Sequence, residues 1–143
     1  MPADAGTLID TSVVVASLDP DEAHHEACDT LLAGGGLTLY AHALAETFSI
    51  LTGGRQGRRL RPVMAAELIR DSVLPHVRLV SLTGKEVMAE LNGAEARGVR
   101  GGAVYDLLHL AAARKAGAAR LLTLDVRDFQ AIVRAGDPQI GSP

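Results

Sequence analysis

The sequence predicts an α/β fold, a three-layer α/β/α sandwich with a parallel sheet of about five strands. Two observations lead to this prediction. Short, almost wholly apolar runs alternate along the chain with longer segments of helical periodicity. Strands that are apolar on both faces are typical of a parallel sheet covered by helices on each side. The 143 residues contain no repeat, low-complexity tract or linker, so we expect a single domain over residues 1–143.

The strands are predicted from their apolar runs. Four candidates cover residues 7–9, 37–41, 77–82 and 119–124. The last of these, ARLLTL, is the clearest. The C-terminal tail is a candidate for one further strand at the edge of the sheet.

The helices are predicted from periodicity and from the residues that begin and end them. Asp10, Thr11 or Ser12 can cap the first helix. For the second, we expect Asp19 at the N-cap and Pro20 at the first helical position, with glycines at its end. Further helices are expected over residues 42–54, 62–76, 83–98, 105–117 and 128–133.

The composition excludes several classes of function. The net charge of −3 lacks the basic excess of many nucleic-acid binders, although it can hide a basic patch or include metal-binding carboxylates. No apolar run approaches the roughly 18 to 20 residues of a membrane span, and no secretory signal is visible. The single Cys28 suits a reducing cytoplasm. With only Tyr40, Phe48, Tyr105 and Phe129 as aromatic residues, we do not expect bases to stack on exposed rings.

Acidic residues fall where the strands of this sheet are expected to end. Asp10 ends the first strand, Asp125 ends ARLLTL, and Asp128 follows three residues later. Glu46 lies one turn into the helix after residues 37–41, and Asp106 opens the helix before ARLLTL. Ligands of open parallel sheets bind beyond the carboxyl ends of the strands. These acids can therefore converge on one rim.

Each acid also has a purely structural interpretation. Asp10 and Asp128 can cap helices, Asp106 can be a first-turn acid favoured by the helix dipole, and Asp125 can be a turn residue. Glu46 is harder to explain in this way, because its helix is largely apolar and a buried charge needs a partner.

Taken together, the acids favour a cation site. Two carboxylates about 4 Å apart repel by roughly 4 kcal/mol at an effective dielectric near 20. Lys and Arg are absent from the immediate sequence neighbourhood of Asp10, Glu46 and Asp106. A hard divalent ion is then the natural partner, and oxygen ligands suit Mg²⁺ or Mn²⁺ rather than zinc.

The ordered set of acids resembles a known family. The segments IDTS, AETFSIL and YDLLHLAAARKAGAARLLTLDVRDF are very similar to PIN-domain nucleases, and within them to the VapC toxins of bacterial toxin–antitoxin pairs. The resemblance covers essentially the whole chain and implies a parallel sheet of about five strands between helices. The helix bearing Glu46 departs from it by opening with Ala41, His42 and Ala43 instead of a small hydroxyl or Pro, which bears on local hydrogen bonding.

The resemblance also implies roles for individual residues. It maps an acidic quartet onto Asp10, Glu46, Asp106 and Asp125, which are both the catalytic and the metal-binding candidates. Asp128 is a possible fifth member, because relatives differ in how the last acid is supplied. Thr11, Ser12 and Thr123 are then hydroxyls that orient carboxylates or water.

The implied activity is Mg²⁺- or Mn²⁺-dependent hydrolysis of RNA phosphodiester bonds, with tRNA or ribosomal RNA as substrate. The products are 5′-phosphate and 3′-hydroxyl ends, and one or two ions take part. The resemblance also implies a homodimer and a small antitoxin that blocks the cleft. A catalytically silent PIN fold that only binds RNA or serves as a scaffold is the main alternative. An α/β phosphatase fits less well, because Ser12 stands where those enzymes need a second acid.

Two basic or titratable features remain. A glycine-rich connection carries four arginines that can bind RNA phosphates, namely Arg55, Arg58, Arg59 and Arg61. A solvated loop or an antitoxin-binding surface is the alternative for them. His109 lies one turn after Asp106, and we expect it to be a packed or supporting residue rather than a proton donor.

Overall fold

A single parallel sheet lies at the centre of the protein, whose structure is a computed structural model that describes residues 6–143. The strand order is β3-β2-β1-β4-β5, and every neighbouring pair is parallel. The strands are β1 (Thr7–Ile9), β2 (Leu37–Tyr40), β3 (Val77–Val80), β4 (Arg120–Leu122) and β5 (Gln139–Gly141). The predicted fold class is confirmed, and the tail does supply the last edge strand.

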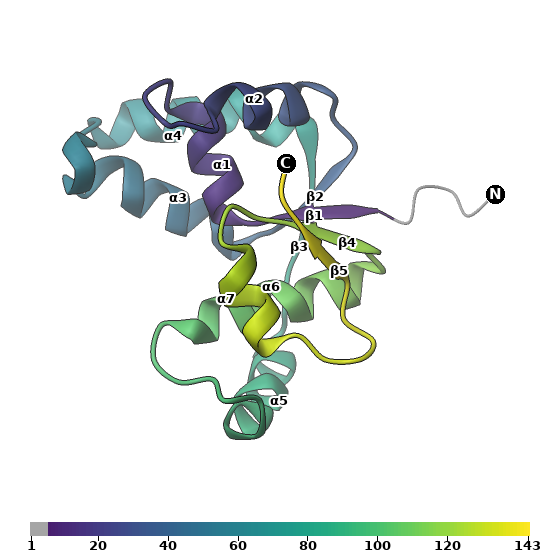
Figure 1. Cartoon of the computed structure of the whole chain (residues 1–143). Helices are drawn as coiled ribbons and strands as arrows, with labels where there is room; N and C mark the ends of the chain where they lie inside the picture. The colour runs from purple at the N-terminus through teal and green to yellow at the C-terminus, as the bar shows by residue number, and fades with distance from the viewer. Residues whose placement is uncertain (1–5) are drawn as a thin grey trace.

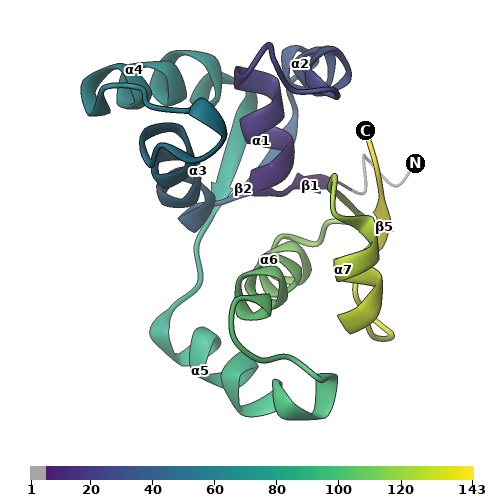
Figure 2. The same ribbon diagram turned by 60° about the vertical axis from the view of Figure 1, so that its left-hand side comes forward.

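Seven α-helices connect and cover these strands within the described residues. They are α1 (Thr11–Leu18), α2 (His25–Ala33), α3 (His42–Thr52), α4 (Pro62–Ser72), α5 (Gly84–Gly93), α6 (Ala103–Ala116) and α7 (Val126–Ile132). Short 3₁₀ turns lie at Arg55–Gly57, Leu74–His76 and Glu95–Arg97. In Figures 1 and 2, α1 to α4 cover one face of the sheet, and α5 to α7 lie on the other.

The two faces of the sheet form two separate cores. Ile9 and Leu39 point toward α1 to α4, while Leu8 and Leu121 point toward α6 and α7. All four side chains are fully buried. Full burial of such a side chain contributes about 1.5–3 kcal/mol, so packing on both faces holds the short strands in place.

The start of α2 corrects one prediction. This helix begins at His25 rather than just after Asp19, and residues 19–24 form turns. Asp19 instead ends α1, and one of its carboxylate oxygens accepts a hydrogen bond from the backbone N–H of Asp21 at 3.0 Å. The other oxygen accepts from Arg58 Nε at 2.7 Å. Asp19 thus makes the side-chain contact of an N-cap, but residues 20–24 form turns and the helix begins only at His25.

The helices next to the acidic residues also begin earlier than predicted. Helix α6 starts at Ala103, two residues before the expected Tyr105, which places Asp106 in its first turn. Helix α7 starts at Val126 instead of Asp128, so Asp125 stands at the N-cap position. These shifts leave the acids close to the ends of β1 and β4.

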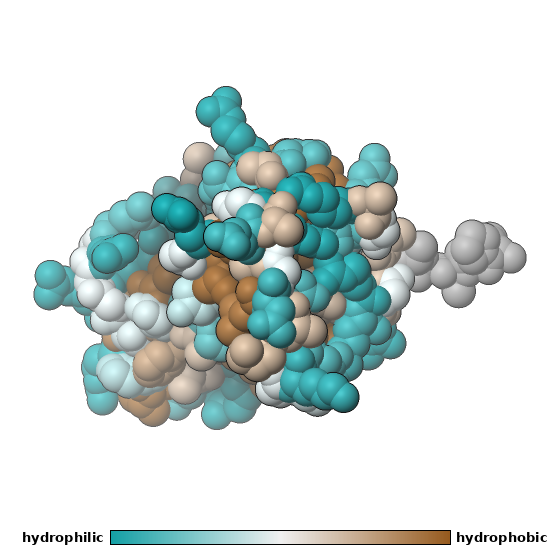
Figure 3. Space-filling model, turned by 90° about the horizontal axis from the view of Figure 1, so that it is seen from below, coloured by the Kyte–Doolittle hydropathy of each residue, from teal (hydrophilic) through white to brown (hydrophobic). Residues whose placement is uncertain are grey.

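The outer surface is mixed in character. Figure 3, seen from below relative to Figure 1, shows apolar atoms in patches that hydrophilic side chains interrupt. Several large apolar side chains are exposed, among them Val63 and Met64 on α4 and Met88 and Leu91 on α5. Over residues 6–143, every helix is too short or too polar to cross a lipid bilayer.

Candidate active site

Asp10 is held at the point where β1 ends and α1 begins. It is 4% exposed, and its Oδ1 accepts hydrogen bonds from Ser12 Oγ at 2.6 Å and from the Val13 backbone N–H at 3.3 Å. Its Oδ2 accepts from Thr123 Oγ1 at 2.7 Å. Burial raises the pKa of Asp10, against the opposing effect of the Ser12 and Thr123 hydrogen bonds. The residue is therefore both the cap of α1 and a rigidly oriented carboxyl group.

Two hydroxyls tie Asp10 to the segment that follows β4. Strands β1 and β4 are neighbours with Ile9 opposite Leu122, so the residues that follow them meet. Ser12 Oγ accepts a hydrogen bond from the Leu124 backbone N–H at 3.0 Å, and Thr123 Oγ1 accepts from the Asp125 N–H at 2.9 Å. These hydroxyls fix the loop carrying Asp125 relative to Asp10. Ser12 and Thr123 thus hold the Asp10 carboxylate, and a role in orienting it for catalysis stays a prediction.

Three further acids act on one another electrostatically near Asp10. The pKa of Asp106 is raised to about 6, first by burial and then by the negative charge of Asp10, with smaller contributions from Asp128 and Asp125. The pKa of Asp125 is also raised by burial, by Asp10 and by Asp128. Asp125 and Asp128 are exposed, whereas Asp106 is half-buried. Four of the predicted acids thus lie near enough for their charges to act on one another, with Asp106 affected by the other three.

Glu46 joins this region through His109. His109 Nε2 lies 3.3 Å from Glu46 Oε1 and 3.4 Å from Thr11 Oγ1. A carboxylate has no proton to give, so an N–H on Nε2 donates to Glu46. Although burial raises the pKa of Glu46, the hydrogen bond and charge of His109 outweigh it and lower the pKa overall. Glu46 is therefore ionised at neutral pH.

His109 itself is a packed residue, as expected, but its contacts could not be read from spacing. It is 2% exposed, and its ring meets that of Tyr40 edge-on, with centroids 5.5 Å apart. Its Nδ1 is buried and has no hydrogen-bond partner within residues 6–143. Because His109 follows Asp106 by three residues, the sequence places both side chains on one face of α6. The contact of His109 with Glu46 on α3 depends on how the two helices pack.

The comparison with protein families decides the identity of this arrangement. The model of the PIN domain matches residues 7–135, which include every acid described above. The chain belongs to the PIN-domain family. This PIN domain is 38% identical over 120 residues to ribonuclease VapC27 of Mycobacterium tuberculosis, a match that covers 83% of this chain and 84% of the relative.

Solved structures agree on the fold of this PIN domain. The crystal structure of Mycobacterium tuberculosis VapC20, described as a toxin that cleaves the sarcin-ricin loop, has a TM-score of 0.69 and 24% identity, covering 93% of this chain and 100% of that one. The structure of VapBC2 from Rickettsia felis bound to a promoter DNA fragment has a TM-score of 0.63 and 16% identity, covering 95% and 97%.

The arginine-rich connection lies away from the acids of the PIN domain. It joins α3 to α4 at the end of α3 that is remote from the sheet (Figure 1). Arg58 is only 12% exposed and forms ion pairs with Asp19 and Glu22, so its guanidinium is already used within the chain. Arg55, Arg59 and Arg61 are exposed. Phosphate binding stays a prediction for these three residues only.

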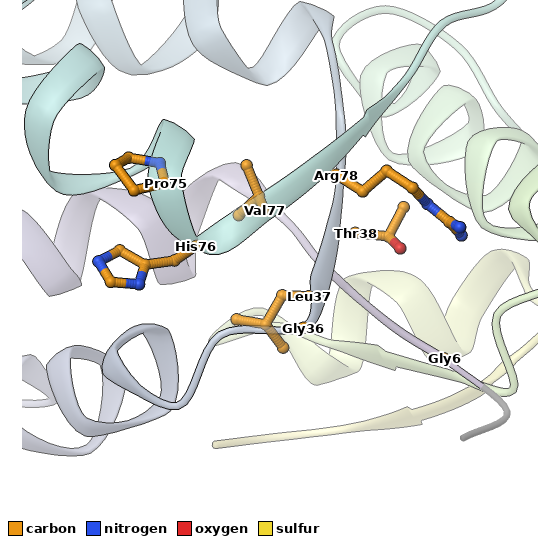
Figure 4. Close-up of a pocket in the computed structure, with 8 residues that line it drawn as sticks. All are labelled: Gly6, Gly36, Leu37, Thr38, Pro75, His76, Val77 and Arg78. Carbon is orange, nitrogen blue, oxygen red and sulfur yellow. The ribbon is translucent and has the colours of Figure 1, made fainter. Parts of the chain in front are cut away.

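A cavity of about 410 Å³ lies at the opposite end of the sheet from the acids. It is lined by residues at the amino ends of the strands, including Gly6, Leu37 and Val77, with His76 and Arg78 beside them (Figure 4). The acids of the candidate active site of this PIN domain are not among the residues that line this cavity.

The acids fit a hard divalent cation by their chemistry. Within the described part of the chain, no three His, Cys, Asp or Glu side chains are arranged to hold a metal ion. Mg²⁺, however, keeps several waters and is commonly bound by one or two carboxylates together with substrate phosphates. Burial, followed by the negative charges of the neighbouring acids, raises the pKa of Asp106, and a cation bound there would offset both effects. Asp10 and Asp106 have the oxygen-ligand chemistry that such an ion prefers, and their role as its ligands stays a prediction.

Proposed function

We propose that the protein is a metal-dependent endoribonuclease that acts as the toxin of a toxin–antitoxin pair. The observation that carries the proposal is the proximity of Asp10, Asp125 and Asp128 to Asp106, whose pKa is raised first by burial and then by their charges, in a chain of the PIN-domain family. The similarity to ribonuclease VapC27 supports RNA as the substrate. We place the activity in the cytoplasm, where tRNA and ribosomal RNA are found.

Each residue of the candidate site has a proposed role in the reaction that follows from its surroundings. Asp10 and Asp106 would hold Mg²⁺ or Mn²⁺, with Asp125 or Asp128 completing the acidic site. A bound divalent cation supplies Lewis acidity and makes water a better nucleophile near neutral pH. Glu46, kept ionised by His109, is the group that can accept a proton from the attacking water. Ser12 and Thr123 keep Asp10 in one orientation throughout.

A small antitoxin and a second copy of the chain are the proposed partners. The antitoxin would cover the acidic rim, and a basic side chain would complement its charge. The antitoxin is tested by expressing the chain together with its neighbouring genes and looking for a small protein that co-purifies with it. Sedimentation of the purified protein tests the homodimer.

Metal removal gives the direct test of the proposed activity. We expect the purified protein to cut total cellular RNA at defined positions with Mg²⁺ or Mn²⁺, leaving 5′-phosphate ends, and EDTA to abolish cutting. Cleavage is measured by mapping RNA ends with and without metal. No cutting with either metal, or cutting that EDTA leaves unchanged, would contradict the proposal.

A silent PIN module that binds RNA without cutting it is the second candidate. The lack of a ready three-ligand arrangement among residues 6–143 is the observation in its favour. Titration calorimetry with Mn²⁺ separates the two functions, since the nuclease binds the ion and the silent module does not at millimolar concentration. Asp106→Asn should weaken the heat of binding if the nuclease assignment is correct.

His109 gives a further test through its contact with Glu46. His109→Phe keeps the ring and its packing on Tyr40 but removes the N–H donor. We expect cleavage to slow about 10- to 100-fold, as for other groups that orient a functional carboxylate. His109→Gln, which can place an amide N–H near the position of Nε2, should retain more activity than His109→Phe. Equal rates for the two variants would show that the hydrogen bond to Glu46 has no part in the reaction.

A further inference from the structure

Two exposed rings stack between the helices that carry Glu46 and Asp106. His42 is the first residue of α3, and Tyr105 lies in the first turn of α6. Their ring centroids are 5.7 Å apart, and the ring planes differ by only 7°. Tyr105 is 48% exposed, and His42 is exposed as well. The pair therefore presents a flat aromatic surface to solvent.

This ring pair is fixed close to the acids by covalent and packing contacts. His42 lies one helical turn before Glu46 on the same face of α3, and Tyr105 directly precedes Asp106. The ring of Tyr40, which is buried, contacts His42 with centroids 5.9 Å apart. Tyr40 also packs on His109, which hydrogen-bonds to Glu46. The same buried ring therefore contacts both the ring pair and the partner of Glu46.

The exposure of these rings distinguishes them from most other aromatic side chains of the described chain. Tyr40 and Phe129 are buried in the second core, where they contribute to folding. A ring as exposed as Tyr105 contributes much less to folding, since its burial is incomplete. Flat rings beside a phosphodiester-cutting site match the recognition of single-stranded RNA, whose unpaired bases stack on aromatic side chains.

We propose that His42 and Tyr105 form a stacking platform for an unpaired RNA base next to the phosphate that is cut. This inference rests on the proposed ribonuclease function and names two residues that position its substrate. The platform selects RNA whose base is free to leave its helix, such as a nucleotide in a loop. It also revises the expectation, drawn from the small number of aromatic residues, that base stacking plays no part.

Cleavage kinetics on the RNA mapped above test the platform. Stacking of one base is worth about 1–3 kcal/mol, so Tyr105→Leu should raise KM about 5- to 150-fold while kcat changes much less. Tyr105→Phe should keep the wild-type KM, because it retains the ring. His42→Leu should likewise raise KM, whereas His42→Phe, which keeps an aromatic ring, should keep the wild-type KM. Phe48→Leu on α3 is the matched control, because it removes an exposed ring away from the platform.

Fluorescence gives a second readout that a purely structural role would not produce. The chain has two tyrosines and no tryptophan, so Tyr40→Phe leaves Tyr105 as the only strong fluorophore. A short single-stranded RNA spanning the mapped site, added in EDTA to prevent cutting, should quench this emission. The same RNA with an abasic nucleotide beside the cut position should not.

The outcomes separate the platform from the nuclease assignment. If the wild-type protein cuts RNA but Tyr105→Leu has the wild-type KM and Tyr105 emission is not quenched, the platform is wrong and the nuclease function stands. If the wild-type protein cuts no RNA with Mg²⁺ or Mn²⁺, the proposed function itself fails. A raised KM restored by Tyr105→Phe, together with quenching, supports the platform.

Discussion

Asp106→Asn is expected to reduce RNA cleavage about 1,000-fold while the protein stays folded. A cation that stabilises developing charge contributes several kcal/mol to the transition state, and each 1.4 kcal/mol corresponds to a factor of ten in rate. Asn keeps the size of the side chain but removes the negative charge that would attract the cation. Single-turnover cleavage of the mapped RNA measures the effect.

The same substitution should stabilise the metal-free protein at pH 7.5. In the wild type, burial and the charges of Asp10, Asp125 and Asp128 raise the pKa of Asp106 to about 6. A raised carboxyl pKa means that the folded state disfavours the ionised form, so Asp106 destabilises the fold above pH 6. The difference in stability between Asp106→Asn and the wild type should shrink toward pH 4, where the Asp106 carboxyl is protonated in the folded chain. Thermal unfolding in EDTA at the two pH values measures it.

Two controls make the result on Asp106 specific. Asp71→Asn changes an exposed acid that pairs with Arg70 on α4, and we expect wild-type cleavage. Asp10→Asn should be inactive too and remain folded, because Asn is as good an N-cap as Asp. Wild-type rates in both Asp10→Asn and Asp106→Asn would refute the site. If Asp106→Asn melted at a lower temperature than the wild type in EDTA, the ionised Asp106 carboxylate would not be a source of instability in the metal-free protein.

Asp137→Asn is expected to lower the free energy of unfolding by about 3 kcal/mol. The Asp137 carboxylate, 1% exposed, accepts hydrogen bonds from Arg97 Nη1 at 3.1 Å, from Arg114, and from the Arg134 backbone N–H at 2.8 Å. Removing one partner of a buried ion pair costs about 3–5 kcal/mol, and the lower end applies because both arginines keep some contact with water. Urea unfolding measures the loss.

The pH dependence of this effect has a definite sign. Although burial raises the pKa of Asp137, the hydrogen bonds from Arg114 and the Arg134 N–H and the charges of Arg114 and Arg97 lower it overall. A lowered pKa gives stability that is present above the unfolded value near 3.8 and is lost as pH falls through the folded value. The wild type and Asp137→Asn should therefore converge in stability as the pH falls below the lowered pKa of Asp137.

An exposed pair in the same protein provides the comparison. Asp71 and Arg70 are each 63% exposed, and such pairs contribute about 0–1 kcal/mol. Asp71→Asn should therefore change the unfolding free energy much less than Asp137→Asn. If the two variants lose the same stability, the burial of Asp137 is not the source of its effect.

Local sequence patterns were sufficient to predict several strands and helix ends of this protein. The strands at 7–9 and 37–40 follow from apolar runs. Thr83 and Glu86 stand three residues apart, which is the spacing of a capping box, and the box is present, with Glu86 N–H donating to Thr83 Oγ1 at 3.1 Å. The position of Asp10 after a buried strand also follows from local pattern. Such features depend on residues within about one helical turn or one strand of each other, which is the range that periodicity and capping describe.

The sequence by itself therefore determined the α/β fold class and the set of acids at the strand ends. Only the tertiary structure decided which side chains meet: Arg58 pairs with Asp19, His109 with Glu46, and Tyr105 with His42. In each case the partners are 39 to 63 residues apart in the chain. Their contact depends on how whole helices pack over the sheet, and no local pattern encodes that packing.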